Sequence, residues 1–262
     1  MEQSARLPDD GAVTGWSTLR LRGGGFFDGL EPDGCTEIPV PLALGPRGNI
    51  RPSAAVSLSW EPLERHEVVR VYGVPCTTVP RGLFDEMRRT GELRPAVVAM
   101  DMAAAAALTS IRRMSAYTDD HGGWMNVPLV RSALPLSSEL SRSPNETRMR
   151  LIWVLDAGLP APLVNQPVWD LGGRLLGIAD LLEPVAGLVG EFDGADHRGA
   201  RRHSKDVDRE ARFRDVRLEV FRVTGPDLAD PPLVVRRMRG ARDRATWAPP
   251  AERAWTIDPP RG

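Results

Sequence analysis

Acidic side chains gather in an otherwise apolar stretch of the chain, residues 175–197, which reads LLGIADLLEPVAGLVGEFDGADH. Carboxylate oxygens suit Mg²⁺ and Mn²⁺, so this stretch could hold a divalent cation. A carboxylate inside an apolar strand is costly to bury unless a partner compensates it, which favours a site role over a solvent-facing position. The candidate cation-binding residues are Asp180, Glu191, Asp193 and His197.

A β-hairpin would bring these acids together. Apolar residues dominate the stretch and a proline-containing break divides it, so we predict strands at 175–182 and 187–193. We expect Asp180 to lie opposite Val189, with Glu191 as its diagonal neighbour at a Cα separation of roughly 7–8 Å. Asp193, two residues beyond Glu191, would share this face. A shift of one residue in the pairing of the two strands would separate the acids.

The composition is that of a globular protein. The chain has 262 residues, of which 42% are hydrophobic and 26% charged, enough to bury the core of one large or two ordinary domains. No apolar run approaches the roughly 18 residues of a membrane span, and the first residues lack the features of a signal peptide. We therefore expect a cytoplasmic protein without a membrane partner. Cys35 and Cys76 are widely separated, so neither a disulfide framework nor a zinc site is indicated.

Positive charge is concentrated towards the end of the chain. Residues 197–244 carry 14 basic and 8 acidic side chains, a balance of +6, although the whole chain has a net charge of −1. Almost all of this charge is arginine, and Lys205 is the only lysine. Arginine suits phosphate recognition, but GC-rich coding explains its abundance equally well, and the run 236–239 is also typical of a solvated helix face.

The first half of the chain predicts an α+β domain at 1–135. Apolar periodicity and glycine or proline breaks indicate three helices and three strands in this half. A segment rich in serine and proline, 132–144, is the best candidate for a linker to the second domain. The expected helices are 12–22, 77–89 and 94–107, and the expected strands are 37–44, 53–59 and 67–73.

The second domain, predicted at 140–245, opens on a strong helix signal. Ser143, Pro144 and Glu146 fit the N-cap, first and third positions of a helix with a capping box, which should end at about Ala157 before Gly158. The elements expected after it are strands 163–169, 175–182 and 187–193, a helix at 204–215, a strand at 217–223 and a helix at 232–245. We expect the tail 246–262 to be irregular.

This order of elements resembles the restriction-endonuclease-like PD-(D/E)xK superfamily, in particular an uncharacterised branch related to very short patch repair endonucleases. The resemblance covers about the last half of the chain, in SPNETRMRLIWVLDAGLPAPLVNQPV, IAD, EFDGADH, HSKDVDRE and LEVFRVTGPDL. It implies an α+β or α/β class with a restriction-endonuclease-like αβββαβ core and a mixed sheet. It also implies DNA as partner and hydrolysis of phosphodiester bonds with Mg²⁺ or Mn²⁺.

The resemblance gives each candidate residue a role. Asp180 and Glu191 would bind the cation directly with the carbonyl of Phe192, and Glu146 would hold a water bound to it. His197 would act as proton donor or acceptor. Asp206 and Arg209 would orient the site and offset phosphate charge. Glu146, Asp193 and His197 also have plain structural explanations, as a capping-box acid, a turn residue and a loop histidine.

The sequence departs from the family pattern at two positions. Asp193 stands where the motif's lysine usually lies, and Ala179 replaces the residue before the first acid. A lysine normally stabilises charge at the reacting phosphate, so Asp193 must hold a second cation, or Lys205 or Arg209 must supply the missing charge. A catalytically inactive nuclease scaffold that regulates or binds DNA is therefore the alternative function.

The first half resembles the C-terminal region of AbiE-type antitoxin proteins. The matching segments are TGWSTLRLRGG, VYGVPCTTVPRGLFDEM and AVVAMDMAA. The resemblance implies a domain that governs partners or targeting, with an antitoxin-like regulator as part of the alternative function. A homodimer stays an open expectation, and acid–base chemistry on a sugar ranks last because no aromatic platform for a sugar is evident.

Overall fold

The computed structural model describes residues 2–31, 33–194 and 209–258, and the chain folds into two compact units. Unit 1 is Met1–Glu139 and unit 2 is Leu140–Gly262, so the division lies inside the segment expected to be a linker. Each unit contains helices and one mixed five-stranded sheet, which confirms the α+β class. No helix in the described ranges is long and apolar enough to cross a bilayer.

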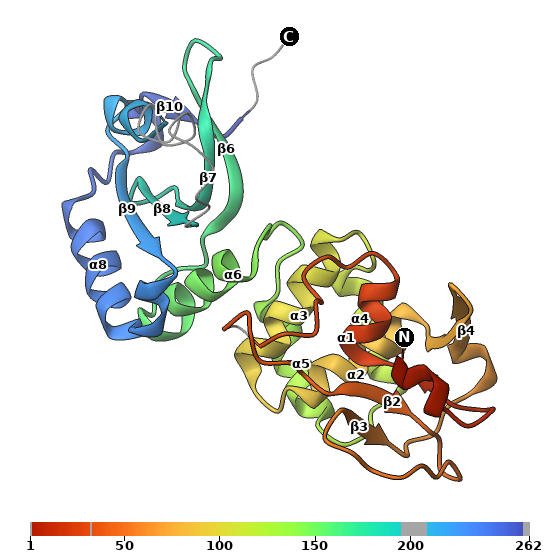
Figure 1. Cartoon of the computed structure of the whole chain (residues 1–262). Helices are drawn as coiled ribbons and strands as arrows, with labels where there is room; N and C mark the ends of the chain where they lie inside the picture. The colour runs from red at the N-terminus through yellow and green to blue at the C-terminus, as the bar shows by residue number, and fades with distance from the viewer. Residues whose placement is uncertain (1, 32, 195–208, 259–262) are drawn as a thin grey trace. The chain divides into compact units, whose positions relative to one another are not determined.

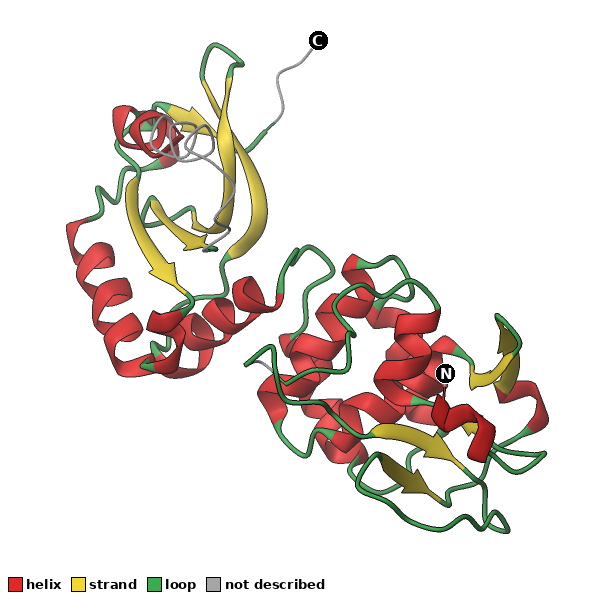
Figure 2. Ribbon diagram, viewed as in Figure 1, coloured by secondary structure: helices red, strands yellow, loops and turns green. Residues whose placement is uncertain are grey.

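Unit 1 packs its helices beside a sheet of order β3-β2-β1-β5-β4 (Figures 1 and 2). Pairs β1–β5 and β2–β3 are parallel, and pairs β1–β2 and β4–β5 are antiparallel. The strands are β1 (Ala12–Val13), β2 (Val40–Ala43), β3 (Val56–Ser59), β4 (Val68–Val71) and β5 (Val74–Thr77). The helices are α1 (Gly15–Leu21), α2 (Val79–Arg89), α3 (Leu93–Ala105), α4 (Ile111–Asp120) and α5 (Val127–Ala133).

The third predicted strand of unit 1 is in fact the first arm of a tight hairpin. Tyr72 and Gly73 adopt φ values of 50° and 80° between β4 and β5, as a two-residue turn of left-handed residues requires. The chain therefore reverses at Tyr72, and β5 extends to Thr77, where we expected the next helix to start. Pro80 in the first turn of α2 marks the true helix start.

An ionic network is buried beneath α2. The Arg81 side chain is 0% exposed, and its guanidinium donates to Glu67 at 2.9 Å and to Asp85 at 2.9 Å. The same guanidinium lies over the Trp124 ring at 4.4 Å from its centroid. Tyr117 donates its hydroxyl to Glu67, and burial together with this bond raises the pKa of Tyr117. Charges this deep are tolerated because each one has an opposite partner.

Unit 2 begins with the helix that the capping box predicted. The helix α6 (Pro144–Leu151) has Ser143 as N-cap, whose hydroxyl accepts from the Glu146 N–H, and a π-helical turn (Ile152–Asp156) extends it. Gly158 then adopts φ 62°, which ends the helical run.

The sheet of unit 2 has the order β10-β6-β7-β8-β9, with only the pair β8–β9 parallel among the described strands (Figure 1). One core, which includes Trp153, Phe221 and Met238, lies between the sheet and the helices α6 and α8. A second core, centred on Phe213, is covered by the helical residues 209–215. The elements are β6 (Leu163–Asp170), β7 (Leu175–Glu183), β8 (Leu188–Asp193), β9 (Glu219–Thr224), α8 (Pro231–Arg244) and β10 (Trp255–Thr256).

The expectation that 246–262 is an irregular tail is wrong for part of this segment. Residues 255–256 form β10, which pairs antiparallel with the end of β6, and Trp255 is 5% exposed in the second core. A two-residue strand has no periodicity to detect. Burial of the Trp255 indole fixes this segment, and only the folded sheet creates that environment.

The observed register of the acidic hairpin differs from the predicted one by two residues. Leu182 pairs with Val189 and Leu181 with Gly190, so Asp180 lies opposite Glu191 and not opposite Val189. The cause is a four-residue turn, 184–187, in which Gly187 adopts φ 75° and donates its N–H to the Glu183 carbonyl. A two-residue shift keeps each side chain on its face and brings the two acids closer together.

Candidate metal and phosphodiester site

A row of polar residues crosses the sheet of unit 2. The β6–β7 register places Asn165 opposite Asp180, the β7–β8 register places Asp180 opposite Glu191, and Glu191 pairs directly with Arg222 on β9. Neighbouring strands lie about 4.8 Å apart, so consecutive members of such a row are within reach of one another. The sheet thus assembles an amide, two carboxylates and a guanidinium from four different strands.

Asn165 breaks the regular alternation of β6 at this row. Val164 and Val168 are four residues apart and should share a face, yet Val164 packs in the first core and Val168 in the second. Asn165 lies between them with φ 47°, a left-handed conformation that asparagine tolerates better than most residues. Its amide donates to the Leu140 carbonyl at 2.9 Å and to Glu146 at 2.8 Å, which ties the start of unit 2 to the row.

Glu191 is the most deeply buried member of the row. It is 3% exposed, and its Oε2 accepts a hydrogen bond from Arg209. Its Oε1 is buried without a hydrogen bond of good geometry from the described residues. Burial first, and then the nearby Asp180 carboxylate, raise the pKa of Glu191 to about 8, against the opposing effect of Arg209 and Arg222. The Asp180 N–H also donates to the Glu191 carboxylate and lowers its pKa, so the cost of burying this acid is compensated only in part.

Asp180 is held in place from the neighbouring strand. Its Oδ2 accepts the backbone N–H of Phe192 at 2.8 Å. Burial raises the pKa of Asp180 to about 6, although this hydrogen bond lowers it, and the Glu146 carboxylate adds to the increase. Two acids with raised pKa values side by side form a site where a bound divalent cation would stabilise both ionised forms.

Glu146 serves the helix start and the site together. Its carboxylate accepts from the Ser143 hydroxyl at 3.0 Å, from the Arg142 N–H at 2.9 Å and from the Asn165 amide at 2.8 Å. The Ser143 hydroxyl caps the Glu146 N–H as expected, but the Glu146 carboxylate accepts the N–H of Arg142 where a capping box would use that of Ser143. These bonds also fix the carboxylate close enough to Asp180 to raise the pKa of that group.

The helical residues 209–215 bring positive charge to the acid pair. Gly177 on β7 allows their close approach, because a Cβ there would lie 2.9 Å from both Arg209 Cγ and the Phe213 ring. Arg209, the first described residue of this helical segment, contacts Glu191. Glu210 accepts from Arg222 at 2.8 Å, so the helix is also anchored to β9 beside the same acid.

Asp193 does not join the acid pair. Its side chain is 51% exposed and faces Arg222 at 3.7 Å. In the parts of the chain that the structure describes, no three His, Cys, Asp or Glu side chains come close enough to hold one cation together. Of the four acids expected at the site, the structure brings Asp180 and Glu191 side by side, places Glu146 close enough to Asp180 to raise its pKa, and leaves Asp193 apart, beside Arg222. His197, Lys205 and Asp206 lie outside the described residues.

Two members of the row, Asn165 and Arg222, were missed in the sequence. Asn165 is a polar residue in the middle of an apolar strand, which is the same signal that identified Asp180. Arg222 carried no such signal because it lies among many arginines in a basic region. Its position beside Glu191 depends on a parallel pairing between β8 and β9, which local patterns do not specify.

Most arginines of α8 form ion pairs or hydrogen bonds within unit 2. Arg242 pairs with Glu183 at 2.8 Å, Arg244 with Glu219 at 2.7 Å and Arg237 with Asp227 at 2.6 Å. Such neutralised side chains contribute little to an attraction for phosphate. This face of α8 therefore fits a solvated, ion-paired surface better than a track for nucleic acid.

The residues at the acid pair fit a hard divalent cation. Mg²⁺ is usually bound by one or two carboxylates and retains several waters, so a set of three or more protein acids is not required. The Glu191 and Asp180 carboxylates are the two ligands that the described residues offer. The Phe192 carbonyl, proposed from the sequence, is a third oxygen on the same strand as Glu191.

We predict that unit 2 loses stability as the pH rises through neutrality. The folded-state pKa values of Asp180 and Glu191, about 6 and about 8, exceed the usual 3.8 and 4.5, so the folded state binds more protons than the unfolded state between those values. Stability is then fully present below the unfolded pKa and is lost as the pH rises through the folded one. The free energy of unfolding should fall by up to about 1.4 kcal/mol per pH unit for each extra proton that the folded state binds.

Urea denaturation in EDTA at a series of pH values measures this loss. Glu191→Gln should flatten the profile, because the amide does not ionise. A profile that is flat for the unaltered protein between about pH 5 and 8 contradicts the buried carboxylate pair.

The geometry of the acid pair is the main guide to function, because comparison with known proteins found no match. No family model, no curated protein and no solved structure matches this chain. The acid pair and the arginines beside it are therefore the features of unit 2 that bear on its function.

Proposed function

We propose that unit 2 is a metal-dependent endonuclease that hydrolyses phosphodiester bonds in DNA. The single observation that carries the proposal is the buried pair of Asp180 and Glu191, whose pKa values are both raised by burial, with two arginines alongside. A purely structural pair of buried acids would be costly, since both are kept from water and repel each other. If the two carboxylates bind protons when the site is empty and a divalent cation when it is filled, the cost of burying them is offset in both states.

Asp180 and Glu191 would hold Mg²⁺ or Mn²⁺. The bound cation would polarise a phosphodiester and lower the pKa of an attacking water. The protein itself positions the two ligands. The Phe192 N–H donates a hydrogen bond to Asp180, and Arg209 donates one to Glu191. Glu146 and Asn165 hold the start of α6 against the acid row, which keeps a third carboxylate near the reacting group.

Arg209 and Arg222 would replace the lysine that the family motif places at Asp193. Hydrolysis of a phosphodiester builds negative charge on the phosphoryl oxygens, and a guanidinium donates two parallel hydrogen bonds to such a group. Arg209 contacts Glu191 directly, and Arg222 lies beside it on the next strand. The two residues thus flank the acid at which the phosphate would sit.

Arg209→Gln should lower the rate of DNA cleavage by about 100-fold, the usual effect of removing one group that stabilises developing charge. Arg209→Lys should restore part of the activity because it retains the charge but not the planar fork. Initial rates of supercoiled-plasmid nicking measure both. Arg214→Gln is the matched control, since Arg214 is on the same helix and pairs with Glu210. Equal rates for Arg209→Gln and the control contradict the role of Arg209.

The direct test of the proposal is plasmid nicking by the full chain with Mg²⁺ or Mn²⁺. The expected result is conversion of supercoiled to open-circular or linear DNA, abolished by EDTA. Absence of conversion with either cation, or equal conversion in EDTA, contradicts the proposal.

One observation favours the alternative, an inactive scaffold that binds DNA or regulates a partner in the manner of an antitoxin. Arg209 already neutralises one oxygen of Glu191 without any cation. Calorimetric titration with Mn²⁺ separates the two functions. A nuclease should take up Mn²⁺ in a manner that depends on Asp180, whereas the scaffold should bind DNA in a salt-dependent manner and take up no cation at these acids.

A further inference from the structure

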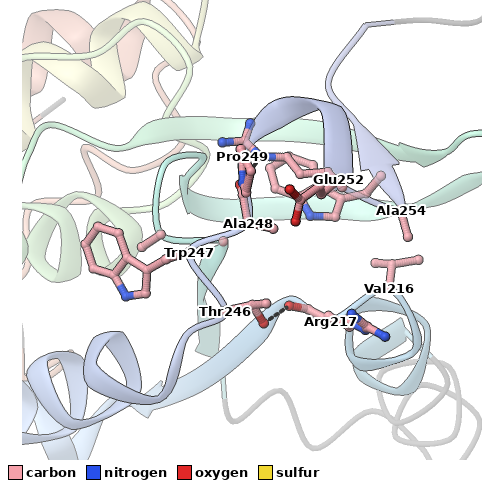
Figure 3. Close-up of a pocket in the computed structure, with 12 residues that line it drawn as sticks. Val216, Arg217, Thr246, Trp247, Ala248, Pro249, Glu252 and Ala254 are labelled. Carbon is pink, nitrogen blue, oxygen red and sulfur yellow. Dashed lines mark hydrogen bonds between the residues drawn. The ribbon is translucent and has the colours of Figure 1, made fainter.

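A cavity of about 150 Å³ lies beside Val216 and Arg217, which follow the helical residues 209–215 (Figure 3). Its other walls come from the β7–β8 turn and from residues 246–255. Arg209, at the other end of this helical segment, contacts Glu191, so the segment runs from the acid pair to the cavity. Its six helical rises span roughly 9 Å.

The cavity wall contains strained backbone. Arg217 and Trp247 adopt φ values of 64° and 54°, a left-handed conformation that bulky side chains rarely adopt. Asn165 is the other non-glycine residue of unit 2 with positive φ among the described residues, and it belongs to the acid row. The Trp247 N–H donates to the Ala186 carbonyl, and the Thr246 hydroxyl donates to the Arg217 carbonyl, so hydrogen bonds hold the strained residues. Strain of this kind concentrates at functional sites.

The cavity's size and aromatic wall suit one planar ring. A cavity of roughly 150 Å³ accommodates benzene in another protein, so a single six-membered ring fits here, whereas a fused purine would extend beyond it. Trp247 lines the cavity and is 43% exposed, with Arg242 at 4.4 Å from its ring centroid. An indole backed by a guanidinium offers a stacking surface for a nucleobase.

The polar side chains that line the cavity would distinguish one pyrimidine base from another. Figure 3 shows the Glu252 carboxylate between Trp247 on one side and Val216 on the other. An ionised carboxylate only accepts hydrogen bonds, so its partner must present N–H groups, as the exocyclic amine of cytosine does. Uracil and thymine present a carbonyl at that position and would meet the carboxylate with a repulsive contact. Arg217 and Arg253 in the wall favour an attached phosphate.

We infer that this cavity binds an unstacked cytosine nucleotide of the nucleic acid on which unit 2 acts. The inference rests on the proposed function for the choice of a nucleic acid, and it adds a base preference to that function. A cytosine held in this cavity, at the other end of residues 209–215 from Arg209, would fix the position at which the backbone is cut.

Calorimetry of the full chain in EDTA with CMP, UMP and AMP tests the inference without any cleavage. CMP should bind at millimolar concentrations or below and at least about 10-fold more tightly than UMP, with AMP weaker still. Glu252→Gln should remove the preference for CMP, and Trp247→Leu should weaken CMP binding about 10-fold. Asp243→Asn, which changes an acid on α8 outside the cavity, is the matched control.

Three results overturn the inference: no heat with CMP at millimolar concentration, equal binding of CMP and UMP, or CMP binding that Glu252→Gln leaves unchanged. A single-stranded oligonucleotide with one cytosine, compared with the same strand carrying an abasic residue, repeats the test in a tighter-binding context. The same titration on the Asp180→Asn variant should be unaltered. Binding of CMP by a chain that cuts no plasmid would therefore remove the proposed function and leave the cavity assignment intact.

Discussion

Asp180→Asn and Glu191→Gln are each expected to reduce divalent-dependent nicking of plasmid DNA by at least about 100-fold. Both substitutions preserve shape while they remove a negative charge from the cation site. An asparagine carbonyl at position 180 could still accept the Phe192 N–H. A glutamine at position 191 resembles the protonated form of Glu191, whose pKa is raised to about 8. The loss should therefore come from the cation site and not from the fold.

Initial nicking rates at several Mn²⁺ concentrations measure this effect. Each variant should also lose carboxylate-dependent Mn²⁺ uptake in calorimetry, while its unfolding midpoint in EDTA at neutral pH should not fall below that of the unaltered protein, because an acid with a raised pKa has been removed. Glu219→Gln is the matched control, because Glu219 is a strand carboxylate of the same sheet that pairs with Arg244 away from the row. Full activity in either acid variant would show that cleavage does not depend on this pair.

Arg81→Ala is expected to destabilise unit 1 by roughly 3–5 kcal/mol, the usual cost of leaving a buried charge without its partner. Arg81 is fully buried, and its loss leaves the buried Glu67 without its cation and Asp85 with Arg88 as its remaining partner. The contact with the Trp124 ring is lost as well, which removes packing in addition to charge.

Urea denaturation followed by tryptophan fluorescence measures the loss, because Trp124 lies against the network. The two units make a single transition for the whole chain an unsafe assumption, so the transition of unit 1 should be fitted separately. Arg89→Ala is the control: Arg89 pairs with Glu86 on the same helix, yet its side chain is 31% exposed, and a cost of at most about 1 kcal/mol is expected. Equal losses for the two variants contradict the role assigned to burial.

Local signals predicted much of unit 2. The capping box at Ser143 indicated the start of α6, and the expected strands 163–169, 175–182 and 187–193 agree closely with β6, β7 and β8. Asp180 and Glu191 were found because an acid in an apolar strand is conspicuous. These features depend on a few neighbouring residues, whose backbone preferences and side-chain alternation act over one turn or one strand.

Which strands pair, and in which register, was decided only by the tertiary structure. A four-residue turn ending at Gly187 set the register and placed Asp180 opposite Glu191. The left-handed Asn165 changed which side chains of β6 face each core, and the parallel pairing of β8 with β9 brought Arg222 to the acids.

The same limit explains the burial of Arg81, which no local pattern indicated, and the strand at Trp255, which lies in the segment expected to be an irregular tail. Their environments are made by segments far away in the sequence: Arg81 contacts Glu67, 14 residues distant, and Trp255 pairs with Asp170. The sequence by itself determined the local elements and the two acids, because short-range sterics, capping and periodicity act within a few residues. The tertiary structure decided the register, the cations beside the acids and the burial of single charges, because those depend on the summed packing of the whole unit.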